Sequence, residues 1–192
     1  WSSTPTEVST NGLGIRSAPL CDIEDADVRI LVLGDSYGFG WCLDEKDCFP
    51  RILENRLRER FPEAGVCVLN ACVPGYGLYQ QRVMLERVLK KIDVDVVITT
   101  YSLANDPIDD LRILRFAPDR LLDYSPGLGR RSGFVRWLVG HSLLARLVDD
   151  RTTGIRFKMA NASPEAVAAS EKCMRELLQT CADNGIHVLQ LQ

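Results

Sequence analysis

The chain has 192 residues, of which 46% are hydrophobic and 26% are charged, and its formal net charge is −3. This length and composition are typical of one globular domain with a proper core, and they argue against a disordered chain. The slight acidic excess argues against a nucleic-acid-binding surface, which usually carries a basic excess. The longest apolar runs are strand-sized, so we expect no transmembrane helix.

The first 27 residues differ in composition from the rest of the chain. They are rich in Ser, Thr, Pro and Gly and show no sustained hydrophobic period, so we expect an extended arm or loop over 1–27 and one domain over 28–192. The chain begins with Trp1 rather than Met and stops at Gln192 inside an apolar run. From these ends we expect a fragment, whose missing N-terminus would hide a signal peptide.

In the domain, β-rich apolar runs alternate with amphipathic segments. The runs predict strands at 28–33, 66–70, 94–99 and 186–191. The amphipathic segments predict helices at 49–61, 78–92 and about 164–182. The apolar positions of the first helix follow 3.6-residue spacing, and they are Ile52, Leu53, Leu57 and Phe61.

Residues at about 107–160 interrupt this rhythm. They contain ten Lys or Arg and six Asp or Glu, and we interpret them as a solvated insert, with an anion-binding patch as the alternative. Within the insert we expect one helix over 134–148, and we expect Asp109 and Asp110 to be surface charges.

The order of these elements predicts the fold class. Strands alternating with helices indicate an α/β protein with a central parallel sheet covered on both faces, that is, a three-layer α/β/α sandwich. Ligands of such sheets bind at the carboxyl ends of the strands. The loops that follow the first three strands are therefore the places to look for a site.

The first of these loops reads Gly-Asp-Ser-Tyr-Gly-Phe-Gly over residues 34–40. A serine two residues after a strand, on a Gly-rich turn into a helix, is well placed as a nucleophile. The alternative is a plain strand–helix turn with Ser36 as N-cap. The loop lacks the Lys-Ser or Lys-Thr of a Walker A motif and does not match G-x-G-x-x-G. It fits G-x-S-x-G, but it follows the first strand of the chain rather than a later one.

The other two loops carry groups that stabilise anions. Residues 70–77 contain Pro74, Gly75 and Gly77, which permit a tight turn and leave a backbone N–H accessible. The third strand is followed by Asn105 and Asp106, and the Asn105 amide is a donor at the same sheet edge. Each loop is also compatible with an ordinary turn.

Taken together, the three strand ends resemble the SGNH/GDSL hydrolase superfamily, which is named for its Ser, Gly, Asn and His blocks. Residues 28–106 carry the resemblance most closely, with Gly-Asp-Ser, Pro-Gly-Tyr-Gly and Ala-Asn-Asp at the three strand ends. The segment 11–16 is similar to the N-x-x-G-x-R arm of many bacterial members, and 49–54 to the first helix of the family. The third block departs from Gly-x-Asn-Asp, because Leu103 stands in place of the glycine.

The resemblance implies a flavodoxin-like SGNH hydrolase fold and a role for each residue. Ser36 would be the nucleophile. The backbone N–H groups of Ser36 and Gly75 and the side-chain amide of Asn105 would form the oxyanion hole, in which loss of one donor costs about 10²–10³ in rate. Asp35 and Asp106 would support these residues.

The family's last block, Asp-x-x-His, is absent from the chain. We expect His187 to pack between sheet and helix or to face a sheet edge, and His141 to have a structural role in the insert. The catalytic His and Asp are therefore expected beyond residue 192, and the 192-residue chain is expected to be inactive or nearly so.

The seven cysteines show no C-x-x-C spacing, and we interpret most of them as buried, reduced thiols, which favours a cytosolic compartment. No cluster of His, Cys or carboxylates suggests a metal, and no cofactor is expected.

The expected function is hydrolysis of carboxylic esters, such as O-acyl groups of sugars, lipids or small esters, through an acyl-enzyme on Ser36. Acyl transfer to a sugar hydroxyl is the closest alternative. Phe134, Trp137 and Tyr124 of the insert are expected to cover the acyl pocket. A non-catalytic carbohydrate- or partner-binding domain and a flavodoxin-like phosphate binder are the rivals from other classes, and the sequence does not indicate the oligomeric state.

Overall fold

The computed structural model describes residues 7–17, 23, 25–102, 106–116, 159 and 162–191. Its centre is a four-stranded sheet in the order β2-β1-β3-β4, and every neighbouring pair of strands is parallel. The strands are β1 (Val28–Leu33), β2 (Val66–Asn70), β3 (Val96–Thr100) and β4 (His187–Leu191). All four predicted strands are present, with ends that differ from the prediction by no more than two residues.

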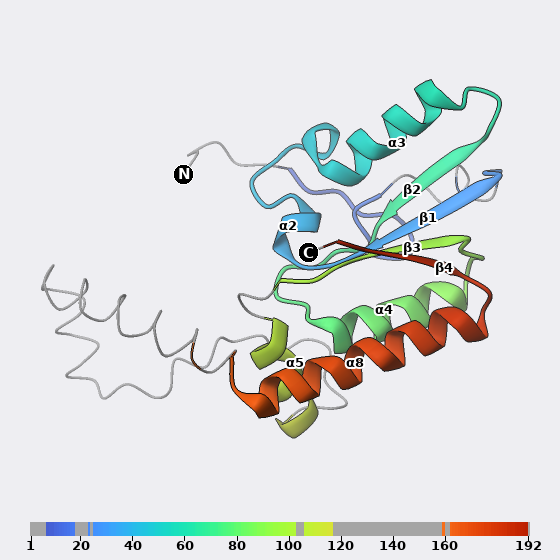
Figure 1. The fold of residues 1–192 in the computed structure, drawn as a ribbon. Coiled ribbons are helices and arrows are strands. Elements are labelled where there is room, and N and C mark those ends of the chain that lie inside the picture. The colour runs from blue at the N-terminus through green and yellow to red at the C-terminus, as the bar shows by residue number, and fades with distance from the viewer. Residues whose placement is uncertain are drawn as a thin grey trace, which may run out of the picture.

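Helices cover both faces of the sheet (Figure 1). Helix α3 (Phe49–Arg60) lies on one face, and α4 (Leu78–Leu89) and α8 (Pro164–Asp183) lie on the other. The short elements are α2 (Ser36–Phe39) and the 3-10 turn η1 (Glu45–Asp47), and α5 (Asp106–Phe116) packs against α8. The three-layer α/β/α sandwich is therefore confirmed for the described residues. The predicted helix 134–148 lies outside them.

The core has one half on each face of the sheet because successive strand residues point to opposite faces. On β1, Leu31 and Leu33 pack toward α4 and α8, whereas Ile30 and Val32 pack toward α3. Burial on both faces explains why the strands read as continuous apolar runs.

The sheet covers only part of the apolar positions of α3. Ile52 and Phe61 are 40% and 51% exposed, whereas Leu53 and Leu57 pack against the core. Helix α3 packs on β2 at one edge of the sheet, so it buries a narrow stripe. Part of that stripe is Glu54, which is fully buried and paired with arginines of its own helix.

The segment 11–16 turns back on itself beside the sheet. The Asn11 side-chain carbonyl accepts a hydrogen bond from the Leu13 N–H at 2.9 Å, and the Asn11 N–H donates to the Ile15 carbonyl at 3.0 Å. The turn inserts Leu13 and Ile15 into the core that α4 and α8 cover. It also places the Arg16 side chain, which is buried, behind α2.

Six free cysteines lie in the described part of the chain, and five of them are buried as predicted. Cys42 is exposed instead, because it lies in the loop after α2. Among the described residues, no helix is long and apolar enough to cross a membrane.

Candidate active site at the carboxyl ends of the strands

Ser36 is the first residue of α2, one short turn that is separated from β1 by Gly34 and Asp35. The residue that caps this turn is Asp35, whose buried side chain accepts a hydrogen bond from the Tyr37 N–H at 2.9 Å. Ser36 is therefore not the N-cap, which was the alternative interpretation of this position. Its half-buried side chain stands at the carboxyl edge of the sheet, where the fold class places ligands.

The turn that carries Ser36 is held from the side of β2. The Asn70 side chain donates to the Gly38 carbonyl at 3.2 Å, and its oxygen accepts from the Cys72 N–H at 3.2 Å. The Val73 N–H donates to the Gly34 carbonyl at 3.0 Å. The loops after β1 and β2 are thus joined by hydrogen bonds on both sides of Ser36.

The arm holds the same turn from behind. The Arg16 guanidinium donates to the carbonyls of Phe39, Gly40 and Leu43 at 2.9, 3.0 and 2.6 Å, and it lies 5.0 Å from the centre of the Phe39 ring. These carbonyls lie at the end of α2 and in the loop after it, so Arg16 fixes where the chain leaves the turn that carries Ser36. The arginine of the N-x-x-G-x-R segment therefore binds the chain at the end of α2.

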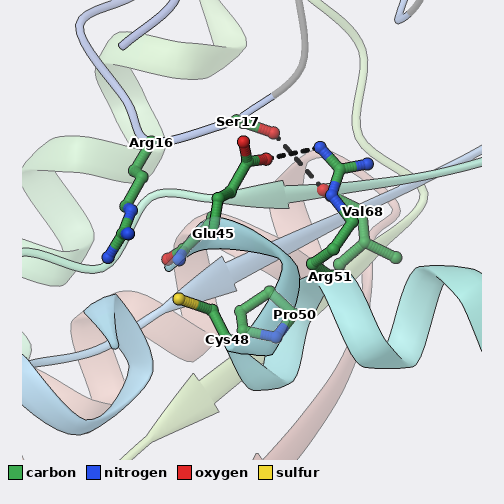
Figure 2. A pocket seen from close by; sticks show the side chains of 8 residues that line it. Arg16, Ser17, Glu45, Cys48, Pro50, Arg51 and Val68 are labelled. Atoms are coloured by element: carbon green, nitrogen blue, oxygen red, sulfur yellow. Dashed lines mark hydrogen bonds and ion pairs between the residues drawn. The ribbon is translucent and has the colours of Figure 1, made fainter. Parts of the chain in front are cut away.

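A small polar cavity lies between the arm, η1, the start of α3 and β2 (Figure 2). Its lining residues are Arg16, Ser17, Glu45, Cys48, Pro50, Arg51, Val68 and Asn70. Two pairs of lining residues bind each other: Arg51 binds Glu45, and the Ser17 hydroxyl donates to the Val68 carbonyl. The cavity does not include Ser36, but its lining residues Arg16 and Asn70 donate hydrogen bonds to the turn that carries Ser36.

The second predicted oxyanion residue, Gly75, lies in the loop between β2 and α4. Its φ of 82° is in the left-handed region that favours glycine. The turn around it is closed by the Tyr76 N–H, which donates to the Val73 carbonyl at 3.1 Å. Ser36 and Gly75 therefore lie in neighbouring loops of one sheet edge. Asn105, the third predicted donor, lies outside the described residues.

The prediction that Asp109 and Asp110 are surface charges was wrong, because both are buried, as is Asp106. Residues 106–116 form α5 and pack on α8, although 107–116 were expected to belong to a solvated insert. Asp106 accepts a hydrogen bond from the Ser102 N–H at 2.8 Å, and Asp109 faces Arg112 at 3.7 Å.

Burial dominates the electrostatics of these carboxylates. It raises the pKa of Asp106 to about 8, against the opposing effect of the hydrogen bond from Ser102. Burial likewise raises the pKa of Asp110 to about 7, although hydrogen bonds from Tyr79 and Ser170 favour its charged form. Asp106 and Asp110 are four residues apart and share one face of α5. In the sequence, their spacing of four residues places the two carboxyls on one face if the segment is helical.

His187 is not placed as a general base for Ser36. His187 is exposed on β4 and pairs in register with Val96, the first residue of β3. It therefore lies at the amino end of its strand, whereas Ser36 follows the carboxyl end of β1. His141 lies outside the described residues.

A comparison with family models finds no match, and a comparison with curated proteins finds none either. Solved structures similar to this chain include AlinE4, described as an SGNH-hydrolase family esterase, at 18% identity and a TM-score of 0.48. That match covers 85% of this chain, and the chain spans only 57% of the length of AlinE4.

Two further similar structures are also esterases. The psychrotrophic esterase EstA from Pseudoalteromonas sp. is 17% identical with a TM-score of 0.39, over 86% of this chain and 78% of EstA. The acetylxylan esterase Axe2 from Geobacillus stearothermophilus is 14% identical with a TM-score of 0.36, over 85% of this chain and 76% of Axe2. At these identities and TM-scores, the similarity does not assign an activity to this chain.

Proposed function

We propose that this chain carries the nucleophile and the oxyanion hole of an SGNH-type serine hydrolase that cleaves carboxylic esters. The observation that carries the proposal is the position of Ser36. It begins α2 at the carboxyl end of β1, Asp35 takes over the capping of that turn, and the Gly75 loop is hydrogen-bonded beside it. Such a turn supports a nucleophile because its hydroxyl faces the ligand edge of the sheet.

In the proposed reaction, the Ser36 Oγ attacks the acyl carbon of the ester while a base removes its proton. The negative charge on the acyl oxygen is met by the backbone N–H groups of Ser36 and Gly75 and by the Asn105 amide. The alcohol leaves with a proton from the conjugate acid of that base. Water then releases the acid from the acyl-enzyme in the same way. The substrates are small esters or O-acyl groups of sugars or lipids.

The base and its orienting acid form a separate part of the proposal. No Asp-x-x-His occurs in the 192 residues, and His187 is at the wrong end of its strand. We therefore assign the His and Asp to a part of the protein other than residues 1–192. The 192-residue chain by itself should hydrolyse esters very slowly or not at all.

The test compares the 192-residue chain with the product of the complete reading frame, using p-nitrophenyl acetate as substrate. We expect turnover by the complete product and a loss of at least about 10³-fold in Ser36→Ala. Ser9→Ala is the matched control, because Ser9 is exposed in the arm and its loss should leave the rate unchanged.

Two results would change the proposal. Turnover by the 192-residue chain that disappears in Ser36→Ala would place the base within these residues. A complete product without Ser36-dependent hydrolysis would reject the esterase and leave a carbohydrate- or partner-binding domain. Release of the acyl group to an added sugar rather than to water would indicate the acyltransferase instead.

A further inference from the structure

Helix α5 presents a carboxylate to the first turn of α4. The Asp110 Oδ1 accepts a hydrogen bond from the Tyr79 N–H at 2.9 Å, and its Oδ2 accepts from the Ser170 hydroxyl on α8 at 2.7 Å. The side chain is fully buried, so both of its oxygens are used within the protein. Asp110 thereby joins three helices, α4, α5 and α8, at one point.

Asp110 contacts the first turn of α4, where the backbone N–H groups have no acceptor within the helix. Gly77 is the N-cap of α4 and Tyr79 is its second residue, whose N–H cannot bond within the helix. Asp110 supplies the missing acceptor at the positive end of the helix dipole. A β-carbon on Gly77 would lie 2.7 Å from the Asp110 Oδ1, so glycine is needed there for the carboxylate to approach.

This anchored helix end is also the end of the loop that carries Gly75. Only Tyr76 separates Gly75 from the N-cap, and the Gly77 N–H is fixed by the Gln80 side chain at 3.0 Å. A shift of the first turn of α4 therefore moves the backbone N–H of Gly75. Displacement of a reacting or stabilising group by about 1 Å can cost about 10² in rate.

We infer that Asp110 is a positioning residue for the oxyanion hole: by holding the first turn of α4, it fixes the Gly75 N–H relative to Ser36. The inference rests on the function proposed above. Asp110 touches neither the substrate nor the reacting atoms, so its effect is transmitted through Tyr79 and the Gly75 loop.

The first arm of the test needs no catalysis and uses the 192-residue chain. Amide hydrogen exchange is followed by NMR in the wild type, Asp110→Ala and Asp110→Asn. We expect the Tyr79 amide to exchange at least about tenfold faster in Asp110→Ala, since Asp110 is its acceptor. Asp110→Asn keeps one oxygen acceptor and should restore the protection. The Gln81 amide, which donates to the Gly77 carbonyl, is the internal reference.

The second arm measures ester hydrolysis by the complete product. Asp110→Ala should lower kcat about 10–100-fold with little change in KM, less than the cost of removing an oxyanion donor. Asp110→Asn should recover most of kcat. Ser170→Ala is the matched control, because it removes the hydrogen bond to α8 but leaves the one to Tyr79.

Each result has one reading. If the Tyr79 amide exchanges no faster in Asp110→Ala, the inferred anchor is wrong whatever the hydrolysis rate. If Ser36→Ala abolishes hydrolysis but Asp110→Ala does not slow it, or Ser170→Ala slows it equally, positioning through α4 is refuted and the esterase stands. If Ser36-dependent hydrolysis is absent, the proposed function is rejected, and so is the role of Asp110 in catalysis. The exchange result then still shows whether Asp110 holds the Tyr79 amide.

Discussion

Replacement of Gly38 by alanine tests how tightly the turn that carries Ser36 is packed. A β-carbon at this position would lie 2.3 Å from the Cys72 Sγ and 3.2 Å from the Cys72 Cβ. Both residues are buried, so the side chains have little room to move apart. Overpacking of this kind costs about 1–3 kcal/mol, and the better helix propensity of alanine returns at most about 1 kcal/mol. We expect Gly38→Ala to lower the free energy of unfolding by about 1–2 kcal/mol.

A double-mutant cycle isolates the contact with the sulfur. Cys72→Ala removes the Sγ, so the added methyl of Gly38→Ala occupies space that the sulfur has left. The two substitutions should therefore be less harmful together than the sum of their separate effects, by about 1 kcal/mol in urea denaturation. Cys67→Ala is the control partner, because Cys67 is equally buried on β2 but packs in the other half of the core. Additive effects of Gly38→Ala and Cys72→Ala would refute the packing argument.

Three further predictions concern stability. Because the pKa values of Asp106 and Asp110 are raised, both carboxyls stay neutral in the folded protein at pH values where they are charged in the unfolded chain. The free energy of unfolding should therefore fall as the pH rises from about 4 to about 8. The decline is up to about 1.4 kcal/mol per pH unit for each group. Urea denaturation at pH 5 and pH 8.5 measures this change. The free energy of unfolding should decline less between these pH values in the double variant Asp106→Asn, Asp110→Asn than in the wild type. Equal declines would contradict the raised pKa values of the two carboxyls. Arg16→Ala should cost about 2–4 kcal/mol in the same assay, because three carbonyls lose a charged donor, with Arg16→Lys intermediate. Tyr37→Ser should change the free energy of unfolding by less than about 0.5 kcal/mol, since Tyr37 is 81% exposed, and a larger loss would show a contact that its exposure hides.

The strands could be predicted from the sequence because their burial leaves a local signal. A strand covered on both faces is apolar at nearly every position, as β1 and β2 are, and glycine or a polar residue marks where it ends. The parallel order followed from the alternation of strands and helices. The three loops followed in turn, because a parallel sheet collects its carboxyl ends at one edge.

The burial of individual helix residues could not be predicted in this way. Hydrophobic period shows which face of a helix is apolar, but it does not show how much of that face a neighbour covers. Ile52 of α3 is exposed for this reason. Asp110 shows the converse, because its burial depends on Tyr79 and Ser170, which lie 31 and 60 residues away along the chain.

The turn that carries Ser36 and the proposed general base pose separate questions for this protein. The turn is held by hydrogen bonds from Arg16 of the arm and from Asn70 and Val73 around β2, all within the described residues. None of these contacts involves a histidine, so the turn does not depend on the base for its order. An oxyanion hole works because its donors are fixed in advance and do not reorganise during the reaction. The contacts that order the Ser36 turn therefore lie within this chain. In the proposed enzyme, the base that would take the proton of Ser36 belongs to another part of the protein.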